Sequence, residues 1–244
     1  MDNDFSHAYR ELEKQHWWFR ARREILKTFI QNLQLPEHSV VIEIGVGSGE
    51  NLYTIYPGHY QLYGIEPFPR NAEYANERGE VPVYTGTAEA WPDELENHRI
   101  DMICMFDVLE HLEHDSAALK YMYEKLQPGG YLLLSVPAYQ WLWGRQDEIS
   151  HHYRRYTRSS LLKKIQNAGF TPDHATYFNS ILFPAIALQR MLQKLTGAEG
   201  SDFDQRFGKA EKLFYRLFQS EKHLLPFMSF PFGVSIFMAA KKTN

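Results

Sequence analysis

Residues 1–35 show the periodicity of an α-helix in their apolar positions. The repeat predicts one helix whose buried face carries Ile25, Leu26, Phe29, Ile30 and Leu33. Pro36 follows directly and ends the helix. Three adjacent aromatic residues, Trp17, Trp18 and Phe19, come before this face. They cannot all lie on one side of a helix, so we expect some of them to face a ligand cleft or a covering element.

Between residues 40 and 137, short apolar runs alternate with segments of helical or loop composition. The runs have the length of buried strands, and the alternation is typical of a parallel sheet with helices on both faces. The pattern predicts strands at 40–44, 62–66, 100–107 and 131–137, with two further strands at 175–180 and 234–240.

The last two predicted strands are separated by residues 181–230. This segment contains an apolar helical stretch at 181–195. A second helical stretch follows, and Ser201 together with Asp204 is an acceptable start for it. The second stretch has helical spacing at Phe203, Phe207, Phe214, Leu217 and Phe218. The two helices could pack on the sheet edge or on a dimer partner, cover a substrate pocket, or touch a membrane surface. We expect packing for most of these side chains and a lid contribution from a few.

Composition limits the class of protein. A chain of 244 residues favours one domain: an N-terminal helical cap at 1–35, a core at 36–180, the insertion at 181–230 and the last strand at 231–244. The formal net charge of −4 is not typical of a nucleic-acid-binding protein. Cys104 lies within an apolar strand, so we expect it to be buried and unreactive. With no signal peptide and no membrane-spanning stretch, a cytoplasmic location is expected.

A glycine-rich turn follows the first predicted strand. The sequence EIGVGSG, residues 43–49, places glycines at alternate positions between a strand and a helix start. Parallel α/β folds hold nucleotide-like ligands at such turns. Glu43 precedes the first glycine and disfavours a pyrophosphate there, but it suits a ligand with a cationic amine such as S-adenosylmethionine (SAM). The next strand also ends in an acid, Glu66, as expected for a group that binds ribose hydroxyls.

With its downstream motifs, the chain resembles the class I SAM-dependent methyltransferases. The matching pieces are EIGVGSG, GIEPF, GTAEAWP, FDVLEHLEH and LQPGGYLLLSVP, in family order over residues 40–137. The resemblance implies a Rossmann-like, seven-stranded, mostly parallel sheet with helices on both faces. N-terminal helices and a helical insertion before the last strand would be added to it.

The resemblance also implies SAM as cofactor and assigns residues to it. Glu43 would meet the methionine amino group, partly through water. Glu66 would accept the ribose hydroxyls. The remaining cofactor-binding residues would be Gly45, Gly47, Gly49, Pro67, Phe68, Ala88, Glu89 and Phe106.

A second cluster, Asp107, Glu110 and His111, lies at the end of the predicted strand 100–107 and just after it, where a substrate would lie. It resembles the E-x-x-E-H motif of the ubiquinone-biosynthesis O-methyltransferases. More distantly, it resembles the small-RNA 2′-O-methyltransferases, in which such a set and a distant histidine bind a divalent cation. Asp107 replaces the first glutamate, and His152 is a candidate for the distant histidine. The four residues are candidates either for acid–base catalysis or for a metal site.

Aromatic and basic residues outside the core are candidates for substrate binding. HWWFRARR and HHYRRYT resemble a group of bacterial methyltransferases of largely unassigned substrate, and they suggest Trp17, Trp18, Arg20 and Arg154. We therefore expect methyl transfer to an oxygen of a small molecule, by a monomer or homodimer; a peripheral membrane contact is compatible with the sequence. The alternatives are an RNA 2′-O-methyltransferase, which the net charge disfavours, and a non-catalytic SAM-binding scaffold protein.

Overall fold

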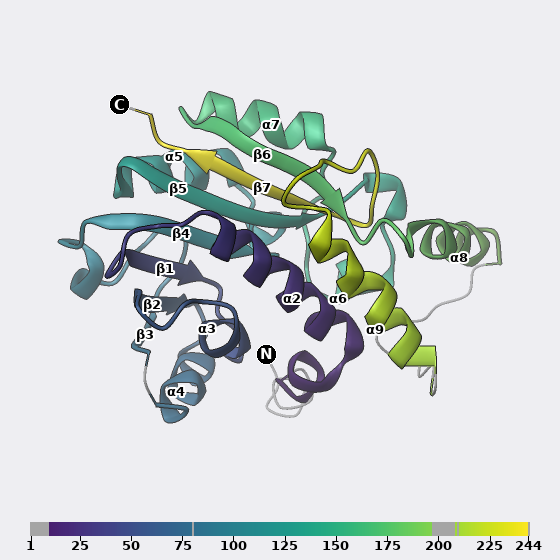
Figure 1. The fold of residues 1–244 in the computed structure, drawn as a ribbon, viewed down its shortest axis with the longest axis horizontal. Helices are drawn as coiled ribbons and strands as arrows, with labels where there is room; N and C mark the ends of the chain where they lie inside the picture. The colour runs from purple at the N-terminus through teal and green to yellow at the C-terminus, as the bar shows by residue number, and fades with distance from the viewer. Residues whose placement is uncertain (1–9, 80, 197–207, 209, 244) are drawn as a thin grey trace.

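The computed structural model describes residues 10–79, 81–196, 208 and 210–243. Its centre is a seven-stranded sheet in the order β3-β2-β1-β4-β5-β7-β6 (Figure 1). Neighbouring strands run parallel except at β7, which pairs antiparallel with both β5 and β6. The predicted mostly parallel sheet is thus confirmed. The strands are β1 (Val40–Ile44), β2 (Gln61–Glu66), β3 (Val83–Thr85), β4 (Ile100–Phe106), β5 (Leu126–Pro137), β6 (Thr171–Phe178) and β7 (Ser235–Lys241).

Helices cover both faces of this sheet. One face packs against α2 and α9, and the other packs against α5 and α7. Side chains alternate along β4, so that Met102 and Cys104 belong to the first layer while Ile103 and Met105 belong to the second. The helices are α2 (Trp17–Asn32), α3 (Glu50–Thr54), α4 (Pro69–Glu77), α5 (Asp115–Lys125), α6 (Arg145–Ile149), α7 (Arg158–Asn167), α8 (Phe183–Thr196) and α9 (Ala210–Ser220).

The apolar face predicted for the N-terminal helix is confirmed. Ile25, Leu26 and Ile30 are fully buried in α2, and Phe29 stacks on Phe237 of β7 with ring centroids 3.7 Å apart. A further helical turn at residues 10–15 precedes α2, and the His16 side chain between them accepts a hydrogen bond from the Trp18 amide. Cys104 is buried, as expected.

The two helices of the insertion differ in how they pack. α9 lies beside α2 (Figure 1), and its Phe218 is fully buried and stacks on Phe178 of β6. In α8, by contrast, Leu188, Met191 and Leu195 are exposed. Of the second predicted stretch, Phe203 and Phe207 lie outside the described residues. The described helices include none that is long and apolar enough to cross a membrane.

The edge strand β6 starts four residues earlier than the 175–180 run suggests. It pairs only with β7, and its first half, Thr171–His174, is polar and partly exposed. A strand covered on one side has no continuous apolar run, so the apolar pattern detects only its buried second half. It ends at Phe178, and Asn179 begins the connection to α8.

Candidate active site

A cavity of about 820 Å³ opens at the carboxyl ends of the parallel strands. Ile44, Glu66, Phe106 and Pro137, the last residues of β1, β2, β4 and β5, lie on its wall. This edge is where open α/β sheets bind ligands. Further wall residues come from α2, α8 and α9, among them Trp17, Trp18, Ile186 and Phe214. The N-terminal helix and the insertion therefore enclose the cavity together with the sheet.

The glycine-rich turn between β1 and α3 requires its glycines. Gly45, Gly47 and Gly49 all have positive φ, a conformation that side chains disfavour. A Cβ atom at Gly45 would lie 2.5 Å from Cγ2 of Val108, and one at Gly47 would lie 3.1 Å from Oε1 of Glu13. Gly45 and Gly47 line the cavity, whereas Gly49 does not. The turn thus leaves its backbone open to close approach by a ligand.

Glu66 ends β2 with a buried carboxylate on the cavity wall. Its Oε2 accepts a hydrogen bond from the Gly47 amide at 2.9 Å, and its Oε1 accepts one from Asn71 at 3.2 Å. Burial raises the pKa of this carboxyl above its ordinary value. Because backbone and amide donors fix it, the carboxylate keeps one orientation beside the glycine turn.

Glu43 lies behind the turn rather than on the cavity wall. Its Oε1 accepts a hydrogen bond from Asn51 at 2.8 Å, and its Oε2 accepts one from the Tyr56 hydroxyl at 2.6 Å. The side chain is buried, and this burial raises the pKa of Glu43 to about 7. In the described structure its carboxylate links β1 to α3 and the following residues, and so supports the turn from below.

Glu13 approaches the same turn from the N-terminal helical segment. Its Oε2 accepts a hydrogen bond from the Ser48 amide at 3.1 Å, and the side chain lines the cavity. Burial raises the pKa of its carboxyl, whereas the nearby Arg22 and Arg23 act in the opposite direction. The sequence analysis missed this residue; its place one helical turn before the aromatic cluster was the available signal.

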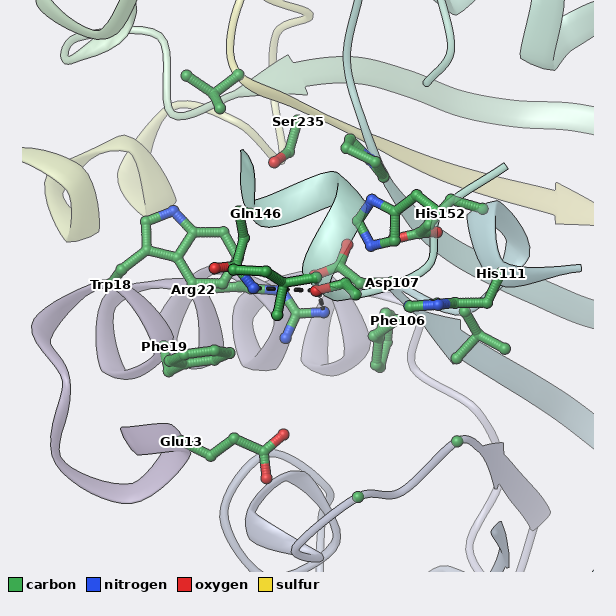
Figure 2. A pocket seen from close by; sticks show the side chains of 18 of the residues that line it. Glu13, Trp18, Phe19, Arg22, Phe106, Asp107, His111, Gln146, His152 and Ser235 are labelled. Carbon is green, nitrogen blue, oxygen red and sulfur yellow. Dashed lines mark hydrogen bonds and ion pairs between the residues drawn. The ribbon is translucent and has the colours of Figure 1, made fainter. Parts of the chain in front are cut away.

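Arg22 and Asp107 join α2 to the strand ends (Figure 2). Arg22 pairs with Oδ2 of Asp107 at 2.7 Å and donates to the Ser135 hydroxyl at 3.1 Å. Ser135 in turn donates to Oδ1 of Asp107 at 2.9 Å. Asp107 has a φ of 56°, and this closed set of contacts holds its strained backbone in place. Arg22 is a second residue that the sequence analysis missed.

The other predicted cofactor residues divide into two groups. Pro67, Phe68, Ala88 and Phe106 line the cavity, with Phe68 at the rim and partly exposed. Glu89 is exposed and does not line it. From this group, the cavity wall therefore carries a proline, two aromatic rings and an alanine, together with Glu66.

The predicted acid–histidine cluster is brought together at the far side of Asp107. The rings of His111 and His152 have centroids 4.5 Å apart and planes at 86° (Figure 2). One ligand atom each from Glu110, His111 and His152 lies within 4.8 Å of the other two. Tyr153 holds this arrangement, because its amide donates to the Glu110 carbonyl at 2.8 Å. Asp107 is outside the group, since Arg22 and Ser135 bind its carboxylate.

Burial controls the charge of Glu110 and His111. Both carboxyl oxygens of Glu110 are buried and have no hydrogen-bond partner among the described residues. Burial and the negative charge of Asp107 raise the pKa of Glu110 well above its ordinary value. Burial and the neighbouring His152 lower the pKa of His111 to about 4. His111 is therefore uncharged at neutral pH, and the shift at Glu110 favours its protonated form.

His152 forms a dyad with the buried Asp147 of α6. Nδ1 of His152 lies 2.9 Å from Oδ1 of Asp147, whose carboxylate also accepts from Nε and Nη2 of Arg155. These donors lower the pKa of Asp147 to about 2 although burial acts to raise it. An ionised carboxylate can only accept, so Nδ1 of His152 holds the hydrogen; in the neutral imidazole, Nε2 then carries the lone pair. Sequence analysis missed Asp147.

Two of the four predicted substrate residues reach the cavity. Trp17 and Trp18 line it. Arg20 instead lies over the ring of Tyr215 in α9, 5.0 Å from its centroid. Arg154 pairs with Asp115 at 2.8 Å and donates to the Glu113 carbonyl. Neither arginine is on the cavity wall, because each is held by a neighbouring surface element.

Three solved structures have the same fold over nearly the whole chain. The partner of the Trm112 methyltransferase activator in a complex from Haloferax volcanii has a TM-score of 0.64 at 13% identity, covering 99% of this chain and 96% of that one. A Thermotoga maritima protein described as a possible histamine N-methyltransferase has a TM-score of 0.59 at 22% identity, covering 98% of each chain. A geranyl diphosphate methyltransferase in complex with SAM has a TM-score of 0.59 at 12% identity, covering 91% and 85%.

At these identities the structures establish the fold alone. No curated protein sequence matches the chain. The model of a methyltransferase domain family matches residues 15–175, which include the glycine turn, Glu66 and the cluster of Glu110, His111 and His152. That match covers more than half of the sequence. The chain therefore belongs to the methyltransferase domain family, a family of SAM-dependent enzymes.

Proposed function

We propose that the chain transfers the methyl group of SAM to a hydroxyl oxygen of a small molecule. The observation that supports this acceptor most directly is the dyad of His152 and Asp147 beside His111. The lone pair on Nε2 of His152 is suited to take a proton from an acceptor as its oxygen is methylated. The ionised Asp147 stabilises the positive charge that then forms on the imidazole.

The half of the cavity around β1 and β2 suits the cofactor. The turn at Gly45 and Gly47 has no room for side chains, which favours close contact between the backbone and a ligand. Glu66 would accept the ribose hydroxyls, and Pro67 and Phe68 would flank the adenine. When bound, SAM supplies an electrophilic methyl group on a sulfonium. The acceptor oxygen forms a bond to that carbon while the carbon–sulfur bond breaks, and S-adenosylhomocysteine leaves.

Positioning supplies most of the catalysis in such an in-line displacement. Trp17, Trp18, Ile186 and Phe214 surround the acceptor half with apolar surface from three helices. We propose that these helices form a cap that excludes water and suits a partly apolar substrate. Since Phe218 of α9 is part of the core, single substitutions test the cap better than removal of the insertion.

A divalent cation is the second candidate for activating the acceptor. The convergence of Glu110, His111 and His152, with Asp147 orienting one imidazole from behind, is an arrangement that metal sites use. Binding of Mn²⁺ to the full chain, weakened by Glu110→Gln and reversed by a chelator, would support this candidate. If chelation leaves both stability and turnover unchanged, the proton-transfer role of His152 is favoured.

Two measurements test cofactor binding and the choice of acceptor. Calorimetry with S-adenosylhomocysteine measures cofactor binding, and release of S-adenosylhomocysteine from SAM is then followed with phenol, aniline and thiophenol series and with a short RNA. We expect methylation of hydroxyl compounds. Transfer to amines alone would contradict the oxygen acceptor. Cofactor binding with no turnover in any series would favour a scaffold protein, and turnover restricted to RNA ends would favour the RNA methyltransferase.

A further inference from the structure

Asn179, on the cavity wall, has a buried side-chain amide that makes no hydrogen bond to any described residue. The residue follows β6 directly and lines the cavity, and its exposed fraction is 0%. Neither Oδ1 nor Nδ2 has a partner among the residues that the structure describes. A buried polar atom without a partner costs free energy, and an amide has two such atoms here. The residue therefore calls for an explanation beyond packing.

The backbone around Asn179 is fixed from two sides. Oε1 of the buried Glu221 accepts from the Ser180 amide at 2.7 Å and from the Ile181 amide at 2.8 Å. On the other side, a Cβ atom at Gly233 would lie 2.4 Å from the Phe178 carbonyl oxygen, so the two chain segments are in close contact. The surrounding structure thus determines where the Asn179 amide lies.

Backbone strain alone does not account for this side chain. Asn179 has a φ of 56°, and asparagine tolerates such a conformation better than most residues. In that role, however, its amide usually bonds to nearby backbone. Asp107 has the same φ, and its carboxylate is fully engaged by Arg22 and Ser135. Among the described residues, no such local contact is made by the Asn179 amide.

The surroundings of Asn179 indicate what the amide recognises. The same cavity wall carries the apolar residues Leu182, just before α8, and Ala185 and Ile186 of α8. The His111–His152 pair belongs to segments that follow β4 and β5, whereas Asn179 follows β6. A ligand that spans these strand ends meets a proton-transfer group at one end and an amide at the other.

We propose that Asn179 recognises a carboxamide or lactam group of the acceptor. Nδ2 donates to the carbonyl oxygen of that group, and Oδ1 accepts from its N–H, so both buried atoms gain a partner. The acceptor then has an apolar body, a hydroxyl at His152 and an amide at Asn179. The proposal rests on the proposed function and specifies its substrate class. Asn179 acts in substrate specificity and not in the bond-forming step.

The test uses benzamide as probe and the full chain saturated with S-adenosylhomocysteine, so that the cofactor half is filled. Ligand-observed NMR measures benzamide binding to the wild type, Asn179→Gly and Asn179→Asp, with ethylbenzene as an apolar probe of similar size. Glycine keeps the positive φ and removes the amide. His38→Gly is the matched control, because His38 also has a positive φ, 64°, but is exposed and away from the cavity.

We expect Asn179→Gly to lower the affinity for benzamide at least tenfold. The affinities for ethylbenzene and S-adenosylhomocysteine should stay within twofold of the wild type. His38→Gly should change none of them. Asn179→Asp should exchange the preference from benzamide to benzamidine, a change that a purely structural role would not produce. Equal benzamide affinity in the wild type and Asn179→Gly would overturn the inference. Failure of the wild type to bind S-adenosylhomocysteine would instead refute the proposed function, and benzamide binding could still be compared without it.

Discussion

The two halves of the cavity differ in how certain buried carboxyl and amide side chains are hydrogen-bonded. In the cofactor half, Glu66 accepts hydrogen bonds from the Gly47 amide and Asn71, and Glu43, behind the turn, accepts from Asn51 and Tyr56. In the acceptor half, Glu110 and Asn179 have buried polar atoms without partners among the described residues. Protein contacts thus organise the first half in advance. We infer that recognition in the second half depends on groups supplied by the ligand.

The largest expected effect is on the acceptor half. His152→Ala removes the proposed base, so turnover should fall roughly 10²- to 10⁴-fold while S-adenosylhomocysteine affinity stays the same. Turnover with a hydroxyl substrate and calorimetry are the two measurements. His98→Ala is the control, because His98 lies against Tyr63 and away from the cavity. Equal losses of turnover and cofactor affinity would show that the two halves are not separable.

Glu43, behind the glycine turn, should make the free energy of unfolding depend on pH, and this can be measured without cofactor. Its pKa is about 7 in the folded protein and near 4.5 when unfolded. The folded state therefore holds this proton more tightly, and its stabilisation is complete below pH 4.5 and lost as pH rises through 7. The loss is about 3 kcal/mol at most.

Urea unfolding of the wild type and Glu43→Gln from pH 4.5 to 8 measures this contribution. The variant should lack the decline. His111 acts in the opposite direction, since its pKa is about 4 and its stabilisation is lost as pH falls from 6.5 through 4. Subtracting the unfolding free energy of Glu43→Gln from that of the wild type removes the His111 contribution, which both proteins share. Parallel pH profiles would contradict an elevated pKa at Glu43.

Removing the Glu66 carboxylate from the cavity wall should have a moderate effect on cofactor affinity. Glu66→Ala is expected to weaken S-adenosylhomocysteine about 10- to 100-fold, as the loss of charge-assisted hydrogen bonds would. Benzamide binding in the acceptor half should not change. Glu89→Ala serves as control, because Glu89 is exposed and off the cavity wall. If Glu89→Ala weakens the cofactor more than Glu66→Ala, the assignment of the ribose site is wrong.

The smallest effect is expected at Arg20, outside both halves. Arg20→Ala loses a contact with the Tyr215 ring, worth about 0.5–1 kcal/mol of unfolding free energy. Turnover and cofactor affinity should stay within twofold. Thermal unfolding measures the change in stability, and steady-state kinetics measures the change in turnover. A tenfold loss of turnover would instead support the predicted role of Arg20 in substrate binding.

Local patterns predicted the parts of the molecule that local residues determine. Short runs of residues predict the strands β1, β2 and β4 and the turn at 45–49, because the local pattern indicates these elements without reference to distant contacts. The meeting of His111 and His152 was also predictable, because both follow neighbouring strands of a parallel sheet.

The missed residues depend on distant contacts. Asp147 lies in the charged stretch RQDEI and is buried only because His152 and Arg155 fold onto it. Arg22 lies in a run of basic residues, and no local feature shows that it reaches Asp107 across the sheet. Asn179 reads as the polar end of a strand. The cost of its unpaired amide is visible only once Glu221 and Gly233 fix the surrounding backbone.

The position of β7 has a consequence for the order of folding during synthesis. This strand comes last in the chain, yet it lies between β5 and β6 and pairs with both. While a ribosome is still making residues 181–234, β6 has no strand to pair with and β5 has an open edge. The cofactor strands β1, β2 and β4 can pair long before that point. The part of the acceptor side that includes Asn179 and Ser235 forms only when β7 enters the sheet, antiparallel, between two earlier strands.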